Sequence, residues 1–116
     1  MNRLLSAAFV VAGLLYGTPA ESAAVKDGNA LLQQCTATVG AFMEFCFGYI
    51  DAIADSLLED RRLGVLDVCV PAELDDVKLR DVVVKFLKEN YGLRQLGAPE
   101  LVAQALSEAY PCQKPQ

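Results

Sequence analysis

Residues 41–59, AFMEFCFGYIDAIADSLLE, set the fold class of this 116-residue chain. Apolar side chains recur at spacings of three and four from Phe42 to Leu57, which predicts one long amphipathic helix with a core-facing stripe. A second apolar row widens that face beyond half of the circumference, so we expect this helix to be central or covered twice. Gly48 lies inside it at a cost of about 1 kcal/mol relative to alanine. We expect this glycine to permit close approach of another backbone, from an intrachain helix or from a dimer mate.

The segments on either side predict further helices. Asp27 is a candidate N-cap for a short first helix, because its carboxylate can accept from backbone N–H groups of the next turn. Asp75 has the same position before a helix whose buried stripe runs from Leu79 to Leu87. Leu74 and Leu79 are placed to pack together as a hydrophobic staple at the start of that helix.

Glycine and proline mark the remaining boundaries. Gly92 is the expected C′ residue of the helix that Asp75 begins, and Pro99 is the expected N1 residue of a last helix that stops at Pro111. We interpret residues 61–67, RRLGVLD, as a loop and residues 93–97, LRQLG, as a short exposed connection. The sequence thus predicts an all-α fold, a small disulfide-stapled bundle of about four helices.

The first residues are typical of a secretory signal peptide. Arg3 supplies a short positive region, and residues 4–15, LLSAAFVVAGLL, form an apolar run that is too short to span a bilayer with its flanks. Small residues at −3 and −1 allow cleavage after Ala20 or after Ala24, and we prefer the second. We therefore expect a signal peptide over residues 1–24 and a single exported domain over residues 25–116, with no membrane attachment after cleavage. A retained membrane anchor is the alternative.

Export changes the meaning of the four cysteines, Cys35, Cys46, Cys69 and Cys112. An even number of cysteines in an oxidising compartment indicates two disulfides, whereas a zinc site would favour C-x-x-C pairs that this spacing does not provide. Short connections tend to make consecutive helices antiparallel neighbours, which favours Cys35 with Cys46 and Cys69 with Cys112. The alternative is Cys46 with Cys69 and Cys35 with Cys112, if the segment from Arg61 runs back along the long helix.

Charge and composition exclude several classes of function. The chain has 10 Lys+Arg against 15 Asp+Glu, so it lacks the basic stripe that nucleic acid requires, and a basic protein partner suits it better. It contains no His and no Trp, which excludes Ser-His-Asp and Cys-His catalysis and zinc sites with histidine ligands. We expect no enzyme activity, no metal and no cofactor.

Asp51, Asp55 and Glu59 are spaced i, i+4 and i+8 on the polar face of the long helix. Like charges at this spacing repel one another by about 0.2–0.5 kcal/mol per pair. The simplest interpretation is a solvated surface, and the competing one is contact with a cation or a basic partner. No nucleophile or base accompanies Asp51 and Asp55, which disfavours a catalytic pair.

Several motifs occur in a distinctive order: FCFGYI at residues 45–50, CVP at 69–71, VVVKFL at 82–87 and AYPC at 109–112. Together they resemble the Rap/Tai family of type VI secretion immunity proteins over nearly the whole mature chain, from about Gly28 to Cys112. The resemblance implies a small all-helical periplasmic protein with disulfides that binds and blocks a cognate peptidoglycan amidase effector, often as a homodimer. The matching residues are mainly core and cysteine positions, so the resemblance bears more on the fold than on the inhibitory contacts.

An inhibitor of this kind needs only a rigid scaffold with a projecting contact. We expect Arg94, Gln95 and Leu96 to supply that contact, with Arg61 and Arg62 as a second candidate; a plain solvated connection is the alternative for each. A function of another class, a free-standing periplasmic stress or chaperone-like helical protein, predicts apolar surface released by acid or reduction. The absence of histidine disfavours a switch near pH 6.

Overall fold

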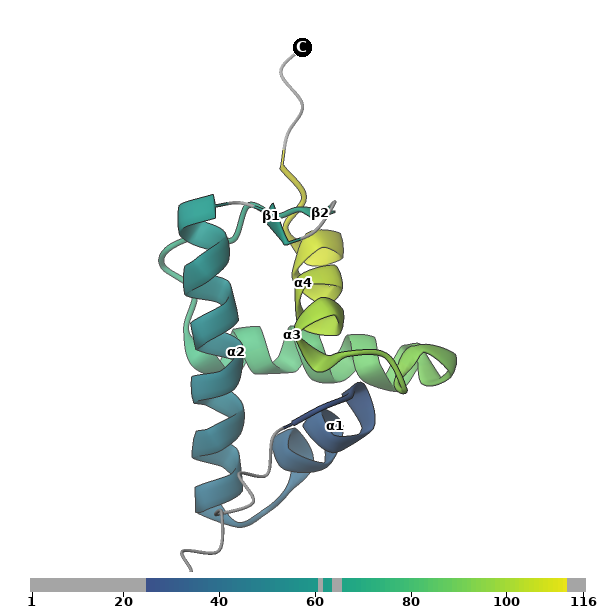
Figure 1. The fold of residues 1–116 in the computed structure, drawn as a ribbon. Helices are drawn as coiled ribbons and strands as arrows, with labels where there is room; N and C mark the ends of the chain where they lie inside the picture. The colour runs from purple at the N-terminus through teal and green to yellow at the C-terminus, as the bar shows by residue number, and fades with distance from the viewer. Residues whose placement is uncertain (1–24, 61, 64–65, 113–116) are drawn as a thin grey trace, which may run out of the picture.

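The computed structural model describes residues 25–60, 62–63 and 66–112, and it confirms the all-α prediction. The four helices are α1 (Gly28–Thr36), α2 (Gly40–Asp60), α3 (Asp76–Glu89) and α4 (Ala98–Ala109). Two short strands, β1 (Arg62–Leu63) and β2 (Leu66–Asp67), follow α2, and a 3₁₀ turn, η1 (Tyr91–Leu93), lies between α3 and α4. Each helix contacts the other three, so the bundle closes around one core (Figure 1).

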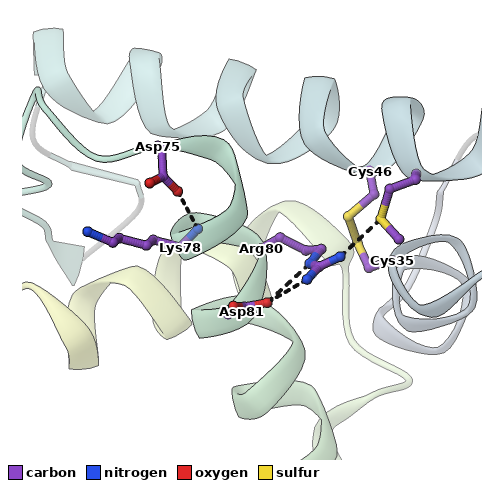
Figure 2. Close-up of polar contacts among 7 residues, drawn as sticks. Cys35, Cys46, Asp75, Lys78, Arg80 and Asp81 are labelled. Carbon is purple, nitrogen blue, oxygen red and sulfur yellow. Dashed lines mark hydrogen bonds and ion pairs between the residues drawn. A yellow bond between two sulfur atoms is a disulfide. The ribbon is translucent and has the colours of Figure 1, made fainter. Parts of the chain in front are cut away.

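Local sequence signals determine where the helices begin. The Asp27 carboxylate accepts from the Ala30 N–H at 2.9 Å, and the Asp75 carboxylate accepts from the Lys78 N–H at 2.8 Å (Figure 2). Both caps confirm the sequence prediction, and each satisfies a backbone donor that has no partner inside its own helix. Pro99 lies in the first turn of α4, where a helix does not need the missing N–H.

The core consists of aliphatic side chains from all four helices and from the segment before α3. Within the described residues, every buried side chain is apolar. The largest fully buried side chains are Leu31, Ile50, Leu57, Leu87, Leu101, Leu106, Val68, Val83, Val102 and Cys46. Burial of one leucine contributes about 1.5–3 kcal/mol, so this cluster is the main source of stability. No helix in the described ranges is long and apolar enough to cross a membrane.

Arg80 extends from α3 toward α2 (Figure 2), where it makes three kinds of contact. One guanidinium nitrogen lies 3.2 Å from the Met43 sulfur, and the guanidinium carbon lies 5.7 Å from the Phe47 ring centroid. The same group forms an ion pair of 2.8 Å with Asp81, its neighbour in the chain. The arginine therefore helps to cover the α2–α3 junction with its stem while its charge stays at the surface.

The disulfides Cys35–Cys46 and Cys69–Cys112 confirm the preferred pairing. The first joins the end of α1 to the beginning of α2. The second joins the segment before α3 to the residues that follow α4. Both bridges therefore fix an entry or exit of a helix rather than the middle of one.

The geometry that brings Cys69 to Cys112 differs from the antiparallel hairpin used to predict it. In Figure 1, α3 runs across the view whereas α4 stands upright. The Cys69 N–H donates to the Tyr110 carbonyl at 3.0 Å, and Val68 forms an isolated antiparallel bridge with Pro111. Backbone pairing between the two linking segments, and not the start of α3, therefore positions this disulfide.

The loop predicted for residues 61–67 is wrong in part, because residues 62–63 and 66–67 form two short strands. β1 and β2 pair in antiparallel register, with Arg62 opposite Asp67 and Leu63 opposite Leu66. The Ser107 hydroxyl of α4 donates to the Asp67 carbonyl at 3.4 Å, which places this small ribbon beside the end of α4. Strands of two residues are too short to produce the alternating pattern by which strands are recognised in a sequence.

Candidate partner-binding surfaces

The connection from α3 to α4 begins with an asparagine cap. Both the backbone N–H and the side-chain amide of Asn90 donate to the Phe86 carbonyl, at 3.0 and 2.8 Å. α3 therefore ends at Glu89, and the prediction that Gly92 is its C′ residue is wrong, because Gly92 lies inside η1. The Asn90 side chain adds a second hydrogen bond to a carbonyl that its own backbone N–H already satisfies, so the helix ends here without a glycine-based motif.

Residues 91–97, here named the contact turn, are held against the start of α1 by backbone hydrogen bonds. Each runs from an N–H to a carbonyl: Gly28 to Leu96 (3.2 Å), Asn29 to Arg94 (3.0 Å) and Ala98 to Lys26 (3.1 Å). Asp27 and Gly97 also form an isolated antiparallel bridge. An irregular surface segment thus has its backbone groups paired with another element of the fold, which limits its freedom to open.

The contact turn presents an aromatic ring that stacks with a cation. Tyr91 is 76% exposed, and the Arg94 guanidinium carbon lies 4.4 Å from the centroid of its ring. Arg94 itself is half-buried, and within the described residues its Nε has no hydrogen-bond partner. Gln95 and Leu96 are exposed beside it. The turn therefore offers an aromatic, a cationic and an aliphatic group on one short segment.

The five predicted contact residues fall into two separate places. Arg94, Gln95 and Leu96 share the contact turn, which precedes α4, whereas β1 begins with Arg62 and lies at the end of the bundle where α4 stops (Figure 1). Arg61 lies outside the described residues. Sequence reasoning missed Tyr91, although an aromatic residue next to a glycine at the end of a helix was a visible signal for an exposed ring.

A second surface is the α2 outer face, defined as Ala41, Phe42, Phe45 and Gly48. Phe42 and Phe45 are 46% and 42% exposed, and with Gln34 and Ala41 they line an open hollow of about 230 Å³. A Cβ built on Gly48 meets no described atom within 4 Å. The predicted intrachain approach to Gly48 is therefore wrong, because the buried stripe of α2 faces the opposite way; approach by a dimer mate stays a prediction.

The Asp76 carboxylate of α3 interacts with Asp51, one of the acidic residues on the polar face of α2. Burial raises the pKa of the Asp51 carboxyl, and a hydrogen bond to the Asp76 side chain and the negative charges of Asp76 and Asp55 raise it further. The side chain of Glu59 lies outside the described residues. In the described part of the chain, no group of three or more Cys, Asp or Glu side chains is arranged to hold a metal ion.

Four helices, two disulfides and one apolar core define a small, disulfide-stapled all-α protein. A family model described as Rap1a immunity proteins matches residues 27–112, a range that includes both disulfides and the contact turn. The chain therefore belongs to the Rap1a immunity protein family, which confirms the resemblance found in the sequence. Searches of curated proteins and of solved structures gave no match.

Proposed function

We propose that this immunity protein acts in the periplasm, where it binds a peptidoglycan amidase effector of a type VI secretion system and covers its active site. Membership of the immunity family supports the binding of a cognate effector. The single observation that supports inhibition by occlusion is the contact turn, an exposed segment whose backbone is already fixed by α1.

The chemistry of the contact turn suits this role. Tyrosine and arginine are the residues most enriched among the dominant contacts of protein interfaces. Ordering one flexible side chain on binding costs about 0.5–1.5 kcal/mol, and the stacking of Arg94 on Tyr91 reduces that cost before the partner arrives. An inhibitor that covers an active site needs no catalytic group or cofactor of its own, and we propose none for this protein.

Binding can be tested with the exported protein and purified peptidoglycan amidases. We expect the wild-type protein to retain its cognate amidase in a pull-down and to block its hydrolysis of peptidoglycan. The double variant Arg94→Glu/Gln95→Ala should bind at least about 10-fold more weakly. Lys78→Glu is the charge-matched control, because Lys78 is an exposed cation at the start of α3. Full inhibition by the double variant would remove the contact turn from the mechanism.

Export directed by a signal peptide at residues 1–24, which lie outside the described residues, is a separate proposal with its own test. Expression of the full chain, followed by recovery from the periplasm and N-terminal sequencing, should yield a protein that starts at Val25. Val25 is buried in the bundle, which supports a folded domain that begins there. A product that retains Met1 and stays in the membrane fraction would overturn cleavage and the boundary at residue 25 and would support the retained anchor. A product that retains Met1 in the cytoplasm would overturn export.

We also propose that the α2 outer face pairs with the same face of a second copy. A two-fold interface must be self-complementary, and here projecting phenylalanines lie beside a hollow while Gly48 leaves room for a close helix. Sedimentation equilibrium should show a dimer for the wild type and a monomer for Phe45→Glu. Val77→Glu, at an exposed apolar position of α3, is the matched control and should remain dimeric. A monomeric wild type would exclude the proposal.

The chaperone-like alternative makes a different use of the same exposed phenylalanines. It requires apolar surface that increases on acidification, and therefore more binding of a hydrophobic dye at pH 3 than at pH 7. An immunity protein should show similar dye binding at both values as long as it stays folded, together with tight binding to one amidase. The two measurements separate the two functions.

A further inference from the structure

We propose that Gly28 is a positioning residue for the contact turn, because its lack of a side chain lets α1 fix the backbone of Arg94 and so preassemble the Tyr91–Arg94 pair for a protein partner. The consequence for binding rests on the function proposed above. The structural consequence does not, and it can be measured on the protein alone.

The first observation behind this proposal is that there is no room for a side chain at Gly28. Gly28 is buried, and a Cβ built on it would lie 3.1 Å from both the Cα and the carbonyl oxygen of Arg94 and 2.5 Å from Leu101 Cδ1. A leucine side chain can rotate away from such a contact. The backbone of Arg94 can move only if the contact turn moves with it.

The second observation is that backbone hydrogen bonds of Arg94 connect it both to α1 and to η1. Its carbonyl accepts from the Asn29 N–H at 3.0 Å, and its own N–H donates to the Tyr91 carbonyl at 3.4 Å, which closes η1 itself. A shift of this backbone therefore changes the position of the Arg94 side chain, whose guanidinium carbon lies 4.4 Å from the Tyr91 ring centroid. Gly28 acts on the aromatic ring through Arg94.

The other described glycines provide a contrast within the same chain. Cβ atoms built on Gly40, Gly48 and Gly92 meet no described atom within 4 Å, and one on Gly97 meets only side-chain atoms at 3.9 and 4.0 Å. Of the five glycines that the structure describes, Gly28 is the only one at which an added Cβ would meet the backbone of another element. Gly40→Ala is therefore a matched control for Gly28→Ala, because Gly40 is exposed and lies outside the α2 outer face.

The preassembled pair also defines the kind of surface that it fits. Tyr91 offers a flat, exposed ring, and within the described residues the Arg94 Nε has no hydrogen-bond partner. The complementary protein surface is an apolar slot for the ring with a carboxylate at its edge, because arginine donates best to planar acceptors of this kind.

The first experiment follows the contact turn without any partner. Amide hydrogen exchange and the NMR signal of the Arg94 Nε–H are recorded for the exported wild type, Gly28→Ala and Gly40→Ala. We expect exchange of the Asn29 amide to be at least about 10-fold faster in Gly28→Ala, with a shifted Nε–H signal as the guanidinium leaves the ring. Amides in the middle of α3 should keep their protection, and Gly40→Ala should resemble the wild type. Wild-type values in Gly28→Ala would overturn the proposal.

A double variant separates the two contacts of Gly28. Leu101→Val removes the Cδ1 atom that the new Cβ would meet, but it leaves the Arg94 backbone in place. We therefore expect Gly28→Ala/Leu101→Val to fold better than Gly28→Ala alone. Its Asn29 amide should still exchange faster than that of Leu101→Val alone. If the Asn29 amide regains its protection in the double variant, Gly28 serves only core packing and the proposed positioning role is wrong. This variant also serves if Gly28→Ala does not fold.

The second experiment uses the amidase that the wild type retains. Tyr91→Ala and Gly28→Ala should each raise the Kd by about 10-fold or more, and Gly40→Ala should leave it unchanged. If Tyr91→Ala weakens binding and Gly28→Ala does not, the positioning role is wrong although the contact turn is right. If Tyr91→Ala and Arg94→Glu both bind normally, the proposed contact is wrong, and the exchange data alone decide the role of Gly28.

Discussion

The contact turn and the α2 outer face are both exposed and both carry aromatic rings, but they are held in place in different ways. The contact turn has an irregular backbone whose position depends on hydrogen bonds to α1. The α2 outer face lies on a regular helix, and no described atom approaches the Cβ position of Gly48. The comparison shows that an irregular segment can be as fixed as a helix, at the cost of depending on a distant part of the chain.

α1 connects the two regions. Its first residues contact the turn through Gly28 and Asn29, and its last turn is joined to α2 by Cys35–Cys46. Changes in α1 should therefore affect the contact turn, whereas changes on the outer face of α2 should stay local. The following variants test this difference, from the largest expected effect to the smallest.

Removal of either disulfide should have the largest effects, and the disulfide that closes the longer loop should contribute more. We expect Cys35→Ala/Cys46→Ala to lower the free energy of unfolding by about 3 kcal/mol, because the unfolded chain is no longer cross-linked. The pair Cys69→Ala/Cys112→Ala closes a longer loop, 43 residues against 11, and should cost about 4 kcal/mol by the same argument. Urea unfolding measures both, and equal stability of the wild type and either pair would contradict the expectation.

Gly28→Ala should lower the free energy of unfolding by about 1–3 kcal/mol, the usual cost of forcing an extra methyl group into a packed site. Calorimetry of the exported protein measures this change. A variant as stable as the wild type would show that the contact turn can move away freely, and the contrast between the two regions would then disappear.

Gly48→Ala should raise the free energy of unfolding, whereas Gly28→Ala lowers it. The new methyl group enters open space on a helix, so we expect a gain of up to about 1 kcal/mol from the higher helix propensity of alanine. Measurement at low protein concentration isolates the monomer. A loss of stability that appears only at high concentration would indicate that a second copy covers this glycine.

Asp51→Asn should have the smallest effect and a definite pH dependence. The raised pKa of Asp51 means that the folded state binds this proton more tightly than the unfolded state, so ionisation of Asp51 at neutral pH destabilises the fold. We expect the variant to be about 0.5 kcal/mol more stable at pH 7. The advantage should vanish as the pH falls below the ordinary pKa of aspartate, about 3.9. Urea unfolding at pH 7 and pH 3.5 checks this, and a constant difference would exclude Asp51 as the cause.

Local patterns account for the features that were predicted correctly. The periodicity of residues 41–59 and the caps at Asp27 and Asp75 depend on residues that are close in sequence. The cysteine pairing was predicted from helix order, and the structure reaches Cys69–Cys112 by a different geometry. The errors at Gly48 and Gly92 have a common cause: a glycine is compatible with a close approach, a helix end or open space, and its own sequence neighbourhood does not distinguish these. The strand pair at 62–67 was missed because it is too short to show a pattern.

The amino-acid sequence determined the helical class, the helix caps and the family resemblance, because helix periodicity, capping residues and motif order are written into neighbouring residues. The tertiary structure decided between the two cysteine pairings, and it decided which exposed segment has its backbone paired and which glycine has no room for a side chain. Residues 28 and 94 are far apart in the chain and meet only in the packed fold, and a contact between such distant positions leaves no local pattern in the sequence.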